Sequence, residues 1–457
     1  MTSLTPPSVH GEALAELYLL DGPVRDYAWG SAELLAELQG RDASGEPEAE
    51  LWLGSHPGAP SVVHHLGASV PLNTLLAAAP AEALGGCLAA GIDASGDPHS
   101  PQLPFLVKLL AAAAPLSIQA HPTVTQAQQG WDAENARGTA LDSPERCYKD
   151  RNHKPEMLIA ITEFSALCGF RDPRDTAGTF RRLGKLQELS ADVLTAVTEF
   201  SQRLEAGDLS GVFTALLDPE GPWADDTDNR TFATRLLTAL CHPDNTDLVA
   251  TDASLSTAVE IAAHHPDDPG VLVSMLMNRV NLSPGEAIFL GAGVVHAYLS
   301  GLGLETMASS DNVLRGGLTP KHINVTELQR VVDFTPTTDP RVHPASRGES
   351  EDGARVETFP VPVNDFIVTG IHLASQSTFH LHDAGPRILV CTAGEVRLEA
   401  SEQSLDLTPG QAAFAPASTR ALALADRSAG SAGSTQKPHN AEHPTTAFVI
   451  GCPSASR

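Results

Sequence analysis

The spacing of apolar and polar residues changes twice along the chain. In residues 18–63, short apolar stretches alternate with turn residues, which predicts strands and loops. Between about residues 175 and 264, apolar residues instead recur every three or four positions, as in an amphipathic helix. They include Leu183, Leu186, Leu189, Val193, Leu194, Val197, Phe200 and Leu204. A turn at 266–270 ends this block, and after residues 271–280 strand and turn signals return, so the pattern predicts a mainly β protein with a helical insertion.

Two segments of the chain resemble each other. Residues 282–292 and 407–417 share Leu, Pro, Gly, Ala, Phe and Ala in register, and in each a Pro-Gly turn leads into a short apolar strand. A repeated unit of this kind predicts two related jelly-roll barrels, with chance similarity as the alternative. Where the first copy has His296, the second has Ala421. We therefore expect only the first barrel to keep a metal ligand.

The length of 457 residues exceeds what a single core organises, so several domains are expected. We place the first part of a catalytic domain at 1–174, the helical insertion at 175–265, the second part of the catalytic domain at 266–340 and a C-terminal barrel at 341–457. The C-terminal barrel has no predicted metal ligands and carries a polar loop at 428–443 that we expect to be mobile.

Charge and hydropathy exclude several classes of partner. The net charge of −27 should repel nucleic acid and anionic lipid. The longest apolar run, 105–118, is broken by Lys108 and Pro115, and residues 1–10 lack the features of a signal peptide. We expect a cytoplasmic protein that binds neither membrane nor nucleic acid. A phosphorylated substrate would need a local positive patch.

The six cysteines are scattered and form no Cys-x-x-Cys pair. This pattern argues against a thiolate zinc site and against a disulfide framework. We predict reduced thiols.

Three short segments contain side chains that bind metals. Gln119 and His121 are two residues apart in a predicted strand, so alternation places both on one face. Residues 152–156 crowd an Asn, a His, a Lys and Glu156 together, and His296 stands in a third segment. Each segment alone also fits an ordinary explanation: a polar pair at a strand end, a solvated turn or a hydrogen-bonded histidine.

A fourth segment offers an anion site. Arg315 and Lys321 flank Gly316 and Gly317, so two cations and backbone amides could converge on a phosphate. A glycine-rich surface loop is the alternative. The spacing of a nucleotide P-loop is absent.

Together these segments closely resemble type I mannose-6-phosphate isomerase (phosphomannose isomerase), a zinc enzyme family with cupin-type barrels and a helical domain. The matching motifs lie at 27–31, 117–122, 148–157, 166–171, 296–301 and 305–321. The last third of the chain resembles the family only in its barrel pattern. The resemblance implies two cupin-type barrels and one Zn²⁺ per chain.

The resemblance also implies roles for individual residues. The zinc ligands would be Gln119, His121, Glu156 and His296. Arg315 matches the active-site arginine. Substrate or phosphate positions fall on Ser117, Lys154 and Lys321, and pocket positions on Trp29, Tyr298, Glu305 and Asp311. Members often carry a lysine where this chain has Val124, so Arg315 and Lys321 would carry more of the phosphate binding.

The implied reaction is the reversible conversion of D-mannose 6-phosphate to D-fructose 6-phosphate through a cis-enediolate. Lys154 is the acid/base candidate, because a desolvated amine close to a metal can exchange protons near neutral pH. His153 is the alternative, for instance in ring opening, and Glu305 and Asp311 stay open. We expect a monomer or a small homo-oligomer.

Two other functions compete with this one. A cupin oxygenase holding Fe(II) usually shows two histidines and a carboxylate with open positions, which Gln119 fits poorly. A non-catalytic sugar-phosphate-binding cupin would have no need of the cluster around Lys154.

Overall fold

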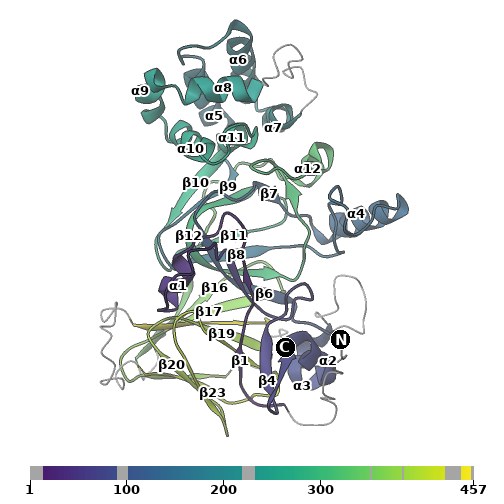
Figure 1. The fold of residues 1–457 in the computed structure, drawn as a ribbon, viewed down its shortest axis with the longest axis vertical. Coiled ribbons are helices and arrows are strands. Elements are labelled where there is room, and N and C mark those ends of the chain that lie inside the picture. The colour runs from purple at the N-terminus through teal and green to yellow at the C-terminus, as the bar shows by residue number, and fades with distance from the viewer. Residues whose placement is uncertain are drawn as a thin grey trace.

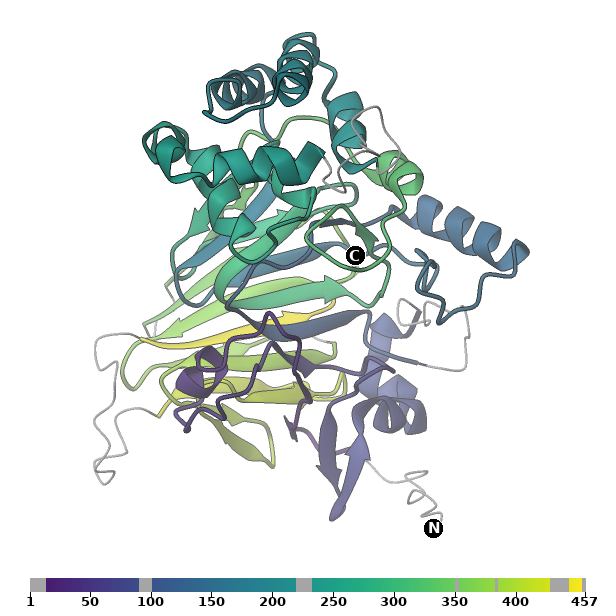
Figure 2. The ribbon, with the colours of Figure 1, turned by 45° about the horizontal axis from the view of Figure 1, so that its top comes forward.

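The computed structural model describes residues 14–89, 101–218, 232–349, 353–382, 385–427 and 444–453. The polar loop predicted at 428–443 lies outside these residues. Within them, strands dominate and form sheets of 11, seven, four and two strands. Most helices of the middle segment gather at one end of the molecule, beyond the sheets (Figures 1 and 2). The mainly β character with a helical segment is confirmed.

Most strands fall into two groups by sheet. The 11-stranded sheet contains β2 (Val24–Arg25), β3 (Glu50–Leu53), β6 (Phe105–Ala112), β7 (Gln119–Ala120), β8 (Glu156–Ala160), β9 (Phe164–Phe170), β10 (Met277–Leu282), β11 (Ala287–Leu290), β12 (His296–Ala308), β13 (Leu314–Arg315) and β14 (Arg341–Val342). The seven-stranded and four-stranded sheets contain β1 (Tyr18–Leu20), β15 (Ala345–Glu349), β16 (Ala354–Phe359), β17 (Ile367–Leu373), β18 (Thr378–Leu381), β19 (Arg387–Ala393), β20 (Val396–Glu399), β21 (Ser404–Leu407), β22 (Ala412–Ala415), β23 (Leu422–Asp426) and β24 (Thr445–Gly451). The two-stranded sheet pairs β4 (Val62–His65) with β5 (Ala68–Pro71).

Helices fill the predicted insertion at 175–265, but the helical segment starts two residues earlier and continues past the predicted end to α11 (Gly270–Ser274). Its helices are α5 (Pro173–Leu183), α6 (Ala191–Glu205), α7 (Leu209–Leu217), α8 (Phe232–Leu240), α9 (Thr246–Ala250), α10 (Ala253–Ala262) and α11. The other helices are α1 (Leu34–Leu38), α2 (Leu72–Ala78), α3 (Pro80–Leu84), α4 (Val124–Ala136) and α12 (Val325–Val331), with 3₁₀ turns at Gly85–Ala89 and Pro243–Asn245. None of the described helices has the length and apolar character needed to cross a lipid bilayer.

The two similar segments adopt the same local structure. Each Pro-Gly turn contains a glycine with positive φ, 89° at Gly285 and 81° at Gly410, and leads into β11 or β22 at the corresponding position. The strand pairing also repeats. In the first unit, formed by the 11-stranded sheet, β8 pairs with β11 and β9 with β10. In the second unit, formed by the seven-stranded and four-stranded sheets, β19 pairs with β22 and β20 with β21. The predicted repeat of the hairpin is therefore confirmed.

The helical segment occupies one connection of this repeated scheme. A short turn joins β20 to β21 in the second unit, whereas α5–α11 lie between β9 and β10 in the first. Long insertions at such surface connections cost little closure entropy. The insertion therefore leaves the pairing of β9 with β10 intact.

Cys87 and Cys452 form a disulfide, so the prediction that all cysteines are reduced is wrong. The two residues lie 365 positions apart, and no local spacing marks them as partners. The free thiols are Cys147, Cys168, Cys241 and Cys391.

The backbone of the helical segment packs directly against the backbone of the glycine-rich loop that contains Gly316 and Gly317. Gly317 has a φ of +123°, and a Cβ there would lie 2.4 Å from the Cα of Gly270 at the start of α11. The side chain of Asp268 accepts hydrogen bonds from the backbone N–H groups of Leu318 and Thr319, at 2.8 Å each. These contacts fix the loop that carries Arg315 and Lys321.

We expect Gly317→Ala to lower the free energy of unfolding by about 1 to 3 kcal/mol more than Gly285→Ala, because only the first adds an atom against a backbone. Gly285 is the matched control, since its φ is also left-handed but the space around it is open. Urea unfolding of both variants measures the difference. Equal losses would show that the contact with Gly270 does not constrain the loop.

Candidate active site

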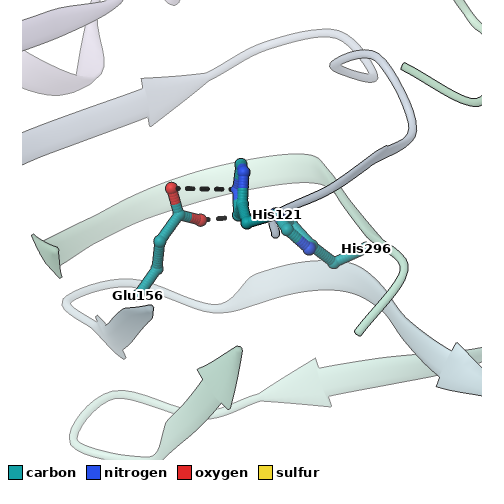
Figure 3. A group of neighbouring side chains, drawn as sticks. All are labelled: His121, Glu156 and His296. Carbon is teal, nitrogen blue, oxygen red and sulfur yellow. Dashed lines mark ion pairs between the residues drawn. The ribbon is translucent and has the colours of Figure 1, made fainter. Parts of the chain in front are cut away.

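His121, Glu156 and His296 meet inside the first unit (Figure 3). They come from the residue after β7 and from the first residues of β8 and β12. The Nε2 atoms of His121 and His296 lie 3.4 and 3.3 Å from the two carboxylate oxygens of Glu156. All three side chains are buried, and their ligand atoms lie within 4.8 Å of one another. The structure thus brings together three of the predicted metal ligands.

The two imidazoles are prepared to bind a cation. The Nδ1–H of His121 donates to the carbonyl of Asn312 at 2.8 Å, and that of His296 donates to the carbonyl of Val294 at 2.9 Å. A neutral ring that donates from Nδ1 has a bare lone pair on Nε2. Both Nε2 atoms are buried and lack a hydrogen-bond partner in the described residues, and burial lowers the pKa of His121 to about 4. These residues fit a divalent metal such as zinc.

Gln119 is placed by strand register. It lies directly opposite His296 on β12 and opposite Arg315 on β13. Residues directly opposite each other in antiparallel strands project to the same face. Ser117 and Gln119 are half-buried, whereas their neighbours Ile118 and Ala120 are fully buried, as alternation predicts.

Lys154 joins the cluster and His153 does not. The Nζ of Lys154 lies 2.9 Å from Glu156, and both side chains are buried. Burial raises the pKa of Glu156, but Lys154 and His121 outweigh this and hold it well below the usual range. His153 instead contacts Asp365, with 3.0 Å between Nε2 and Oδ2. Of the two acid/base candidates, only Lys154 lies among the side chains that surround Glu156.

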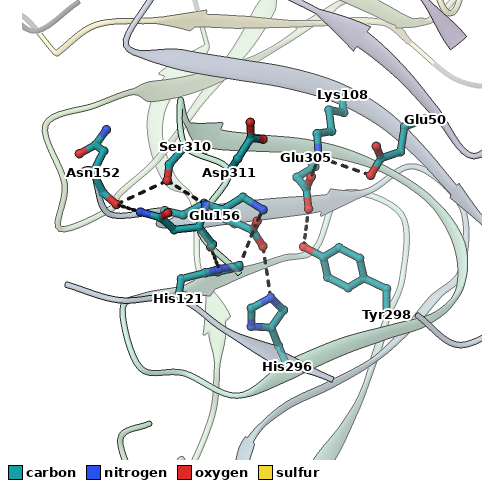
Figure 4. Close-up of polar contacts among 12 residues, drawn as sticks. Glu50, Lys108, His121, Asn152, Glu156, His296, Tyr298, Glu305, Ser310 and Asp311 are labelled. Carbon is teal, nitrogen blue, oxygen red and sulfur yellow. Dashed lines mark hydrogen bonds and ion pairs between the residues drawn. The ribbon is translucent and has the colours of Figure 1, made fainter. Parts of the chain in front are cut away.

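A second charged group lies beside the cluster and contains two residues that sequence reasoning did not assign to the site (Figure 4). Lys108 lies 3.0 Å from Glu305 and 3.4 Å from Glu50, and Tyr298 donates to Glu305 at 2.9 Å. Burial alone would lower the pKa of Lys108, but Glu305, Glu50 and Glu156 raise it. Lys108 interrupts the apolar strand β6, and a buried charge in such a strand was the available signal of a partner.

Cations gather on the other side of Gln119. Arg315 is partly buried on β13, and Lys321 is exposed six positions later. Burial and the charge of Arg315 lower the pKa of Lys321, which indicates that the two cations are close. Burial and the charges of Arg146 and Arg315 also lower the pKa of Lys149. Arg315, Lys321 and Lys149 therefore lie near one another in a strongly acidic chain.

The remaining predicted pocket residues lie around this site. Trp29 stacks on Tyr27 with ring centroids 5.7 Å apart and packs against the apolar cluster that contains Tyr298. Asp311 faces His56, with 3.4 Å between Oδ2 and Nε2.

Comparison with known proteins agrees with this geometry. Residues 17–173 match the family model described as phosphomannose isomerase type I, catalytic domain. The mannose-6-phosphate isomerase of Escherichia coli strain K12 is 36% identical over 395 residues, which cover 86% of this chain and 92% of the relative. That of Salmonella typhimurium is 38% identical over 394 residues, with the same coverage.

Solved structures show the same likeness. A zinc-bound mannose 6-phosphate isomerase aligns with a TM-score of 0.79 and 33% identity, over 96% of this chain and 100% of the other. The Salmonella typhimurium enzyme bound to fructose 6-phosphate and zinc aligns with a TM-score of 0.78 and the same identity and coverage. From the motifs, the buried cluster and relatives of this similarity, we conclude that the chain belongs to the type I phosphomannose isomerase family.

Proposed function

We propose that this protein interconverts D-mannose 6-phosphate and D-fructose 6-phosphate, as a mannose-6-phosphate isomerase. The observation that carries the proposal is the buried cluster of His121, Glu156 and His296 with Lys154 against its carboxylate. Relatives that share this name are similar over 86% of the chain, and one neighbouring structure holds fructose 6-phosphate and zinc.

In this proposal His121, Glu156 and His296 hold one Zn²⁺ per chain, with Gln119 as the fourth protein ligand. Two neutral imidazoles and a carboxylate are ligands that zinc prefers. Gln119 lies opposite His296 in the strand pairing, which supports the assignment of its amide oxygen as a ligand. When bound, zinc would supply Lewis acidity to the sugar's oxygens.

Proton transfer between C2 and C1 needs a base beside the metal, and we assign this role to Lys154. Its Nζ lies next to Glu156, whereas His153 is engaged by Asp365. Glu305 and Asp311 remain alternatives. Both oxygens of Glu305 already have partners, one in Lys108 and one in Tyr298, which makes it the less available base.

We assign the phosphate group to Arg315 and Lys321. A guanidinium stays protonated and binds phosphate oxygens in pairs, so Arg315 suits an anion better than proton transfer. In the described part of the chain Arg315 has no carboxylate partner, which leaves its charge available. Trp29, Ser117, Tyr298 and Asp311 would complete the walls of the sugar pocket.

We also propose the layout of two cupin-type barrels and a helical domain, with boundaries at 1–174, 175–265, 266–340 and 341–457. The repeated strand pairing supports two related units. Chain segments cross between them, since β1 pairs with β22 and β14 pairs with β11. A cytoplasmic location and a monomer or small homo-oligomer stay predictions from the sequence.

The proposed reaction predicts zinc-dependent turnover of mannose 6-phosphate in an assay coupled to fructose 6-phosphate formation. Chelation should abolish turnover and added zinc should restore it. His296→Ala should lower kcat/KM by at least about a hundredfold, because it removes a metal ligand, and even the groups that hydrogen-bond to such ligands are typically worth 10- to 100-fold. His372→Ala is the matched control, because His372 faces a glutamate, Glu357, in the second unit.

Full activity of His296→Ala would contradict the metal assignment. Binding of mannose 6-phosphate by the zinc-loaded wild type without turnover would instead favour the non-catalytic sugar-phosphate-binding cupin.

Replacing Arg315 with Ala should raise the KM for mannose 6-phosphate by about 10- to 100-fold, the value of hydrogen bonds to a charged group. Zinc content should not change. Arg341→Ala is the control, since this arginine lies at the edge strand β14 and pairs with Asp339. A fall in kcat with an unchanged KM would show that Arg315 acts at the reacting carbons rather than on the phosphate.

A further inference from the structure

A buried polar cluster lies behind the metal ligands, and the proposed reaction gives it no role. Its centre is the carboxylate of Asp150 (Figure 4 shows its neighbours Ser310 and Asn152). The carboxylate accepts hydrogen bonds from the backbone N–H groups of Asn152 and Asp311, at 2.8 and 2.7 Å. It also accepts from the hydroxyl of Ser310 at 2.9 Å and the side-chain amide of Asn312 at 3.0 Å. One carboxylate thus joins two segments that are distant in sequence.

The side chain of Asn312 strengthens the same connection. It is fully buried, and its Oδ1 accepts from the backbone N–H groups of Lys149 and Asp150, at 2.7 and 3.1 Å. Its Nδ2 donates to the backbone carbonyls of Asp150 and Asn152, at 3.0 and 2.7 Å. Every polar group of the amide is therefore used to hold residues 149–152, just before Lys154 and Glu156.

The backbone carbonyl of Asn312 is the acceptor that orients His121. The two histidines differ in this respect. His296 donates to Val294, two residues away in its own segment, whereas the acceptor for His121 lies 191 residues away in sequence. The tautomer and ring angle of His121 therefore depend on tertiary contacts that hold residue 312 in place.

We propose that Asn312 and Asp150 are positioning residues of the metal centre. They hold the Asn312 carbonyl against His121 and fix it relative to the segment that carries Lys154 and Glu156. Neither residue touches the metal or the sugar. Groups that orient a metal-bound imidazole through its second nitrogen are typically worth 10- to 100-fold in metal affinity. The inference rests on the zinc site proposed above.

The test measures zinc affinity of the full-length protein by competition with a chromophoric chelator, without substrate. Asn312→Ala should bind zinc about 10- to 100-fold more weakly than the wild type. The pairing of β13 with β7 does not involve this side chain, so the variant should keep the strand that carries Arg315.

Asn245→Ala is the matched control. Asn245 is also a buried asparagine, and its side chain bonds the backbone N–H and C=O of Gln187 and the carbonyl of Ala239, in the helical segment. Its replacement should lower the thermal midpoint as Asn312→Ala does but leave zinc affinity at the wild-type value. A role in stability alone would leave both variants with wild-type zinc affinity, and this result would overturn the proposal.

Ser310→Ala provides a second test, which decides the matter if Asn312→Ala does not fold. It removes one donor to Asp150 and should weaken zinc binding by a few-fold. Unchanged affinity would overturn the positioning role while the isomerase assignment stands. Wild-type protein that binds zinc but does not turn over mannose 6-phosphate would overturn the assigned reaction instead.

Discussion

The site depends on one constraint: two neutral imidazoles and a carboxylate must converge where water is excluded. A buried carboxylate without partners is costly, and two buried imidazole nitrogens without partners add to the cost. Lys154 compensates part of this by its contact with Glu156. The Nε2 atoms of His121 and His296 each have a lone pair available for a cation, because the Nδ1–H groups donate to backbone carbonyls. The strands of the first unit hold this unfavourable arrangement in place.

The second unit shows what the same strand pairing looks like without that constraint. Its interior cluster is formed by apolar side chains from both of its sheets, such as Leu389, Val396 and Leu424. The position that corresponds to His296 is Ala421. In the first unit, charged and polar side chains replace part of this apolar interior; Lys154 pairs with Glu156, and Lys108 and Tyr298 both contact Glu305. The buried group of possible metal ligands therefore lies in the first unit.

Sequence reasoning found what local spacing encodes. The repeat of the hairpin, the helical insertion and the grouping of His121, Glu156 and His296 were predicted and are present. His153 contacts Asp365, whereas Lys154 contacts Glu156. Alternation along an extended segment explains why the two neighbours point to different sides, but the prediction for this segment did not use it.

Contacts set by tertiary structure were beyond the sequence. Lys108 meets Glu50 because β3 pairs with β6 in a particular register, and Glu305 because β6 pairs with β12. The bond from His121 to Asn312 and the disulfide between Cys87 and Cys452 join residues 191 and 365 positions apart. Such contacts depend on how the whole chain folds, and no short sequence motif predicts them.

We propose above that the buried cluster of His121, Glu156 and His296 is a zinc centre. Anomalous diffraction from crystals of the zinc-loaded protein, recorded on both sides of the zinc absorption edge, tests it most directly. We expect one strong peak per chain, within bonding distance of both Nε2 atoms and of Glu156, with Gln119 completing the ligands. A peak elsewhere, in protein that is active and contains zinc, would show that this cluster is not the zinc centre.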